Sequence, residues 1–164
     1  MLSKIAFAVF SAIGLAASMG VVAAHAQGTA AEHPARCIPT EEDSLGPFYK
    51  PDAPVRSVIG NGYRLKGQVK SSDDCSPISG AKIEFWLAGP DGQYDDAHRA
   101  TLHSDHDGFY SLESNYPPSY SSRPPHIHIR ITAPGYRTLV TQHYPKPGES
   151  GSSSDLVLTP GSPQ

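Results

Sequence analysis

Residues 126–131 of this 164-residue chain alternate strictly between two kinds of side chain, and this pattern constrains the fold most. His126, His128 and Arg130 occupy one set of positions, with isoleucines at 127, 129 and 131 between them. Successive side chains of a β-strand point to opposite faces, so the pattern predicts a strand with one polar and one apolar face. The isoleucine face suits a packed sheet. The two imidazoles lie side by side on the other face as potential metal ligands.

Short strand patterns recur along the rest of the chain, separated by turn residues. We expect further strands at 63–70, 81–87, 100–103, 109–112, 138–142 and 155–158, a hairpin turn at 105–108 and a loop over 146–154. An extended arm that carries Phe48 and Tyr49 precedes them. No stretch after residue 26 keeps a helical periodicity. The predicted fold class is therefore all-β: an antiparallel β-sandwich with an N-terminal extended arm and little helix.

The first 26 residues have the pattern of a secretory signal peptide: Lys4, an apolar run, and a small-x-small sequence at 24–26. The alternative is a retained membrane anchor, which the small residues of the run disfavour. We expect residues 27–38 to be a flexible lead-in and residues 39–164 to form one domain. The mature protein would then be exported, either periplasmic or secreted, with no membrane segment.

The charge of the chain disfavours two classes of partner. The whole chain has a formal net charge of −3, and removal of Lys4 with the signal peptide would make it −3 − 1 = −4. The sequence contains no basic run. Nucleic acid and anionic membranes are therefore poor partners for it.

The two cysteines, Cys37 and Cys75, both lie in the part predicted to be exported. Small domains in oxidising compartments usually pair their cysteines, so we predict a disulfide between them. In the chain-entropy model such a link contributes about 3–4 kcal/mol, and it would fix the arm to the domain. Two free thiols that bind a metal are the alternative.

Tyrosines are the other residues of ligand type near the histidine pair. No cysteine or carboxylate stands close enough in sequence to complete an obvious zinc site, whereas Tyr94, Tyr116 and Tyr120 are nearby. A free phenol has a pKa of about 10, so only a strongly acidic cation makes it a ligand at neutral pH. Two histidines with two tyrosines favour Fe(III), but their spacing does not select the tyrosines.

Several motifs, in order along the chain, resemble the intradiol ring-cleavage dioxygenases, the non-haem ferric enzymes related to protocatechuate 3,4-dioxygenase and catechol 1,2-dioxygenase. Residues 45–49 resemble the N-terminal arm of that family, and 67–69 and 77–86 resemble its first strands. Residues 92–95 and 118–120 resemble the segments of its two tyrosine ligands, and 141–144 the segment of its active-site glutamine. The most specific match is Arg-Pro-Pro-His-Ile-His at 123–128.

This resemblance implies an enzyme that uses Fe(III) and O2 to cleave a catechol between its two hydroxyl-bearing carbons, giving a muconate-type product. The iron ligands that it implies are Tyr94, Tyr120, His126 and His128. The catalytic residues that it implies are Arg123, Tyr120 and Gln142. Tyr120 would leave the metal and accept a substrate proton, and Arg123 would stabilise negative charge on the substrate. The residues expected to contact the substrate are Tyr49, Arg123 and Gln142.

Two rival interpretations stand beside the enzyme. Residues 67–86 also resemble transthyretin-like sandwich domains, which would make the chain an exported binding module and leave the histidine pair unexplained. An exported protein that binds iron or copper without turnover is the other rival.

Three features distinguish this chain from the best-known family members: export, the lack of a helical N-terminal dimerisation region and the short stretch between Tyr120 and His126. They leave open which catechol is the substrate and whether the chain forms a homo-oligomer.

Overall fold

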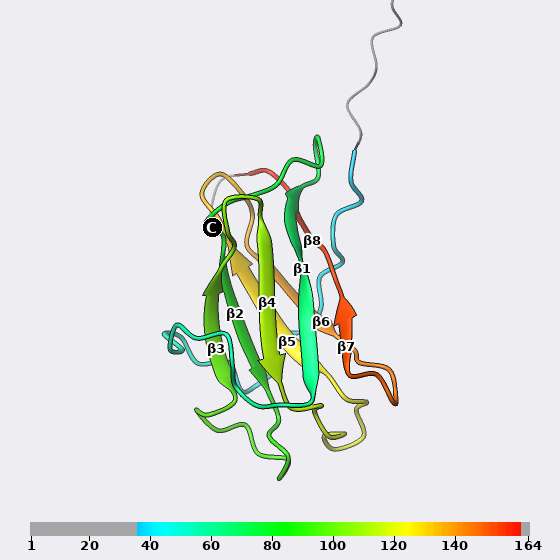
Figure 1. Cartoon of the computed structure of the whole chain (residues 1–164). Helices are drawn as coiled ribbons and strands as arrows, with labels where there is room; N and C mark the ends of the chain where they lie inside the picture. The colour runs from blue at the N-terminus through cyan, green and yellow to red at the C-terminus, as the bar shows by residue number, and fades with distance from the viewer. Residues whose placement is uncertain (1–35, 162–164) are drawn as a thin grey trace, which may run out of the picture. The chain divides into compact units, whose positions relative to one another are not determined.

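Eight β-strands and no helix make up the part of the chain that the computed structural model describes, residues 36–161 (Figure 1). The predicted signal peptide and residues 27–35 of the predicted lead-in lie outside the described residues. The strands are β1 (Tyr63–Ser71), β2 (Lys82–Leu87), β3 (Arg99–His103), β4 (Phe109–Ser114), β5 (Ile127–Thr132), β6 (Leu139–His143), β7 (Gly151–Ser153) and β8 (Leu156–Leu158). Over this range, no helix is present that is long and apolar enough to span a membrane.

The strands form two four-stranded sheets. In the first sheet, β4 pairs with one edge of β1, while β7 and β8 pair with its other edge. The second sheet has the order β3-β2-β5-β6, and all its pairs are antiparallel. Apolar side chains of both sheets form one buried core, which includes Leu65, Leu112, Phe85, Ile129 and Ile131. The predicted all-β sandwich is confirmed.

Two local predictions within this fold are wrong. Residues 105–108 do form a tight turn, in which the Gly108 N–H donates to the Asp105 carbonyl at 3.0 Å. However, β3 and β4 on its two sides belong to different sheets, so the turn connects the layers and is not a hairpin. Residues 151–153, expected to be loop, form β7 parallel to β1. A Cβ on Gly151 would lie 2.6 Å from the Arg64 carbonyl oxygen, so glycine permits this close pairing.

The N-terminal arm, residues 36–62, begins beside β8 and ends beside β4, and its middle part, residues 43–54, lies over the outer face of the second sheet. The Asp43 N–H donates to the Val140 carbonyl at 2.9 Å, and the Thr101 N–H donates to the Pro54 carbonyl at 2.8 Å. Glu84 and Trp86 point away from the core, yet each is only 2% exposed because the arm lies over them. The arm contains no helical turn, which confirms the predicted extended arm.

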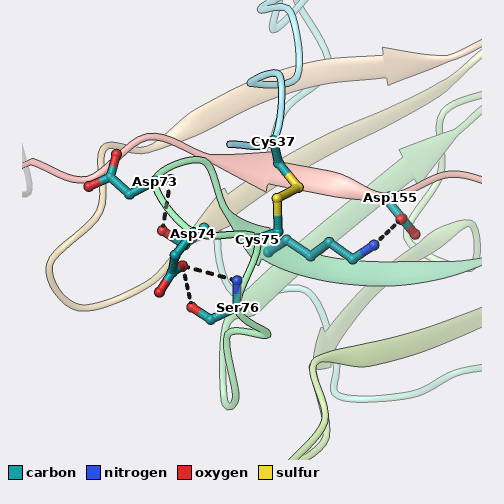
Figure 2. Close-up of a disulfide and its surroundings, with 8 residues drawn as sticks. Cys37, Asp73, Asp74, Cys75, Ser76 and Asp155 are labelled. Carbon is teal, nitrogen blue, oxygen red and sulfur yellow. Dashed lines mark hydrogen bonds and ion pairs between the residues drawn. A yellow bond between two sulfur atoms is a disulfide. The ribbon is translucent and has the colours of Figure 1, made fainter. Parts of the chain in front are cut away.

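The Cys37–Cys75 disulfide attaches the start of this arm to the turn after β1 (Figure 2). Cys75 has a φ of 61°, in the left-handed region, and hydrogen bonds around it hold this conformation. Its N–H donates to the Ser71 carbonyl at 3.0 Å, and Asp74 Oδ1 accepts from the Ser76 hydroxyl at 2.7 Å. The predicted disulfide is confirmed, and Cys37, near the end of the predicted lead-in, is anchored.

The carboxylate of Glu84 lies almost fully buried under the arm, with 3% of its side chain exposed. Its oxygens lie 3.0 Å from Lys82 Nζ and 2.6 Å from Arg130 Nη1. The Tyr49 hydroxyl donates to it at 3.3 Å. Burial favours the neutral acid, but the hydrogen bonds and charges of Lys82 and Arg130 outweigh it and lower the pKa of Glu84 from its ordinary value of 4.5.

We expect Glu84→Gln to lower the free energy of unfolding by about 1–3 kcal/mol at neutral pH, because Lys82 and Arg130 lose their charged partner. Since the folded-state pKa is depressed, this stabilisation is present above the unfolded-state pKa and is lost as the pH falls through the folded-state value. Urea unfolding of both proteins at neutral pH and at about pH 3 measures the effect. A difference that stays the same at the lower pH would contradict this account.

Candidate metal centre

The candidate site lies on the outer face of the second sheet, at the end where β5 begins. Directly opposed residues of neighbouring strands point to the same face. The strand register places Arg99, Trp86, His128 and Gln142 in one row across β3, β2, β5 and β6. The alternation that buries the isoleucines of β5 therefore puts His128 beside Gln142, a residue distant in sequence.

His128 is held in the middle of this row by the Trp86 indole. The two rings are parallel within 3°, with centres 4.9 Å apart, and His128 is 2% exposed. Burial, followed by the charges of His126 and Arg123, lowers the pKa of His128 to about 4. The imidazole is therefore neutral at physiological pH, which is the form that binds metals.

His126 lies immediately before β5 and is oriented by the turn that precedes it. Its Nδ1 is 2.8 Å from the Pro124 carbonyl oxygen, which can only accept, so Nδ1 carries the hydrogen and Nε2 keeps a lone pair. That Nε2 lies 2.9 Å from the Tyr94 hydroxyl oxygen. The His126 and His128 ring centres are 4.8 Å apart. The imidazoles of His126 and His128 thus face a common space with Tyr94.

The structure brings two of the three candidate tyrosines to the histidines. The Tyr94 ring centre lies 5.3 Å from that of Tyr120 and 5.9 Å from that of His128. Tyr120 and Arg123 exchange backbone hydrogen bonds of 3.3 and 3.0 Å across a two-residue turn. This turn places both residues shortly before β5 begins. Tyr116 instead donates to the Pro145 carbonyl at 3.2 Å, in a different part of the sandwich.

This donor set fits a hard trivalent cation. Among residues 36–161, no three His, Cys, Asp or Glu side chains gather to hold a metal, so phenol oxygens are the donors available beside the imidazoles. Burial raises the pKa of the Tyr94 phenol, and the nearby Arg123 charge only partly offsets it. A phenolate at this position therefore needs a strongly acidic cation such as Fe(III).

The arm forms one wall of the site. The Phe48 ring stacks on Tyr94 with centres 4.4 Å apart and meets Tyr120 edge-on at 5.4 Å. The buried Arg99 joins these segments, because its guanidinium donates to the Phe48 carbonyl at 2.6 Å and to the Tyr94 carbonyl at 3.0 Å. Gly46 has a φ of 70°, and a Cβ there would lie 2.9 Å from the His128 ring. Glycine thus allows the arm to approach the imidazole.

Arg123 and Gln142 are adjacent at the edge of the same space. Arg123 Nη2 donates to Gln142 Oε1 at 2.9 Å. The amide nitrogen of Gln142 donates in turn to the Ser44 carbonyl at 2.6 Å, so the arm also orients Gln142. The rings of the four candidate metal ligands, called the donor rings below, are those of Tyr94, Tyr120, His126 and His128. A fixed guanidinium next to these rings can stabilise negative charge that develops there.

Tyr49 lies outside the group formed by Arg123 and Gln142. Its ring packs against Trp86, with centres 5.2 Å apart, and its hydroxyl is directed to Glu84. The Arg130 guanidinium lies 5.6 Å from its ring centre. Its hydrogen-bond and ring contacts within residues 36–161 include neither Arg123 nor Gln142. A role in substrate binding stays a prediction.

Sequence reasoning missed five residues of the site: Asp43, Phe48, Trp86, Arg99 and Tyr144. Phe48 and Tyr144 lie inside motifs of the family resemblance, next to residues that the resemblance implicates. Trp86 and Arg99 belong to strands whose register with β5 cannot be derived from local pattern. Asp43 reaches the site only because the arm folds back over the sheet.

Comparisons with known proteins give this geometry a family context. The chain is 31% identical over 143 residues to an intradiol ring-cleavage dioxygenase of Aspergillus niger, an alignment that covers 65% of this chain and 45% of that protein. It is 31% identical over 142 residues to a catechol 1,2-dioxygenase of Candida albicans, covering 64% and 46%. These relatives are intradiol ring-cleavage dioxygenases. The resemblance that the motifs carry is thereby confirmed.

The solved structures agree with the intradiol dioxygenase relatives. The dioxygenase domain of a dioxygenase–carbohydrate-binding protein fusion from Streptomyces superimposes with a TM-score of 0.67 and 28% identity, over 76% of this chain and 100% of that domain. No family model matches the chain. The chain spans about half the length of the curated intradiol dioxygenases that it matches.

Proposed function

We propose that the protein is a non-haem Fe(III) intradiol dioxygenase that inserts both atoms of O2 between the two hydroxyl-bearing carbons of a catechol, giving a muconate-type product. The observation that carries this proposal is the convergence of two phenols and two imidazoles from separate segments. Tyr94 Oη lies 2.9 Å from His126 Nε2, and the rings of Tyr120 and His128 both lie within 6 Å of the Tyr94 ring, at 5.3 and 5.9 Å between centres.

In this proposal Tyr94, Tyr120, His126 and His128 hold the iron. Bound Fe(III) would supply Lewis acidity toward the two substrate oxygens. Tyr120 is half-buried, and no hydrogen bond within residues 36–161 occupies its hydroxyl. We assign it to accept a proton from the catechol at Oη. Arg123 and Gln142 then orient the substrate, and the Arg123 guanidinium stabilises negative charge on its ring.

We also propose that the protein acts after export, in the periplasm or outside the cell. The Cys37–Cys75 disulfide supports an oxidising compartment. The signal-peptide pattern of residues 1–26 supports the same location.

Iron-loaded protein tests the proposed function. Tyrosinate bound to Fe(III) absorbs visible light by charge transfer, so we expect a coloured protein whose absorption shifts when catechol is added. Oxygen uptake with a panel of substituted catechols then identifies the substrate. Arg123→Leu should keep iron and colour and lose at least about a hundredfold in turnover. Colourless protein after iron loading would favour a transthyretin-like binding module. Wild-type turnover in Arg123→Leu would contradict the role of Arg123.

A further inference from the structure

Tyr144 and Asp43 extend the hydrogen bonds of Arg123 into the arm, and the Tyr144 ring lies 6.3 Å, centre to centre, from that of His126. Arg123 Nη2 donates to the Tyr144 hydroxyl oxygen at 3.0 Å as well as to Gln142. The Tyr144 hydroxyl donates to Asp43 Oδ2 at 2.7 Å. Asp43 Oδ1 accepts from the Ser44 N–H at 2.6 Å, which fixes the carboxylate within the arm. The Tyr144 hydroxyl therefore links the Arg123 guanidinium, in the turn before β5, to the arm.

The direction of these hydrogen bonds is determined by chemistry. A guanidinium only donates and a carboxylate only accepts. The single hydrogen of the Tyr144 hydroxyl must therefore point to Asp43, which leaves its lone pair directed at Arg123. The two groups in contact with Arg123 are thus neutral acceptors. Among the described residues Arg123 forms no ion pair, so its positive charge is not neutralised by direct contact with a carboxylate.

Both contacts use the same nitrogen of Arg123. Its side-chain hydrogen bonds within residues 36–161 come from Nη2, so Nη1 and Nε remain available as donors. A free arginine side chain has many accessible rotamers, and a substrate would otherwise have to offset the loss of this rotamer entropy on binding. Fixing the guanidinium in advance removes that cost and keeps it in a productive orientation.

We propose that Asp43 and Tyr144 are positioning residues that hold the Arg123 guanidinium through Nη2 and keep its other donors free for the substrate. This inference rests on the proposed dioxygenase function, in which Arg123 acts on the substrate. Tyr144 is 41% exposed, so we expect Tyr144→Phe to leave the fold intact and to report only the loss of the hydroxyl.

The position of Arg123 can be tested without turnover. The NMR signal of Arg123 Nε–H in the metal-free protein reports the mobility of its side chain on the picosecond-to-nanosecond timescale. We expect Tyr144→Phe and Asp43→Asn to make this group more mobile. Tyr136→Phe is the matched control, because Tyr136 lies away from the site and its hydrogen bonds to residues 36–161 are made by its backbone. Unchanged mobility of Arg123 in both Tyr144→Phe and Asp43→Asn would overturn the proposal.

Kinetics of the iron-loaded protein test the consequence for catalysis. Tyr144→Phe and Asp43→Asn should each lower kcat roughly tenfold or more, with little change in iron content or visible absorption. The double variant should lose no more than either single variant, because both act through one guanidinium. Additive losses, or wild-type kcat in both single variants, would overturn the positioning role. If the wild-type protein turns over no catechol, the proposed function fails, and the NMR result alone then decides whether Asp43 and Tyr144 position Arg123.

Discussion

Tyr94→Phe should abolish the visible absorption that the iron-loaded wild-type protein is expected to show, and should lower turnover by more than about a hundredfold. The substitution removes one phenol oxygen 2.9 Å from His126 Nε2 and keeps the ring that stacks on Phe48. Loss of a residue that only orients a metal ligand already costs about 10–100-fold, and loss of a direct donor should cost more. Metal analysis after dialysis, absorption spectra and oxygen uptake measure iron retention, colour and turnover.

Tyr116→Phe is the matched control for this experiment. Tyr116 is also a partly buried tyrosine, but its hydroxyl donates to the Pro145 carbonyl at 3.2 Å and lies outside the donor group. We expect it to keep iron, colour and turnover. If Tyr116→Phe lost the colour and Tyr94→Phe kept it, the ligand set proposed from the geometry would be wrong.

The double variant Cys37→Ser/Cys75→Ser should lower the free energy of unfolding by about 4 kcal/mol, from the chain entropy of the loop between two cysteines 38 residues apart. For a domain of this size, that corresponds to a fall in Tm of roughly 15 °C. The arm that the disulfide anchors carries Phe48 and Gly46, which pack on Tyr94 and His128. We therefore expect weaker iron retention as well as lower stability.

The chain has only two cysteines, so reduction of the wild-type protein serves as an independent control. Thermal unfolding with and without a reductant should give the same loss for the wild type and no change for the serine variant. Equal Tm values for the wild type and the double variant would show that the arm is held by its other contacts. One of these other contacts is the hydrogen bond from the Asp43 N–H to the Val140 carbonyl, at 2.9 Å.

Much of the sandwich follows from local pattern. Period-two alternation in β5 and β1 places Ile129 and Leu65 in the core, because a strand with one apolar face must bury that face. The two errors both concern partners that local pattern does not specify. The turn at 105–108 has the composition of a hairpin, yet its flanking strands pair in different sheets. The strand β7 has the sequence Gly-Ser-Ser, which shows no apolar alternation. It is a strand because its backbone pairs with an edge of β1.

The candidate site is predictable to a different extent. The His126–His128 spacing and the family motifs are enough to single out the four donor rings and Arg123. The neighbours that orient them are not predictable in this way. Trp86 reaches His128 through the β2–β5 register, and Phe48 reaches Tyr94 through the fold of the arm.

Residue type and spacing over a few positions are sufficient to establish which strand faces are apolar, which side chains have the chemistry of metal ligands and which cysteines can pair. They do not establish which distant groups meet. The folded domain is what brings Tyr94 and Tyr120 to the histidines and leaves Tyr116 apart. It also brings Asp43 and Tyr144 to the Arg123 guanidinium. These contacts depend on strand register and on the path of the arm, which are set by packing of the whole domain and not by any short segment.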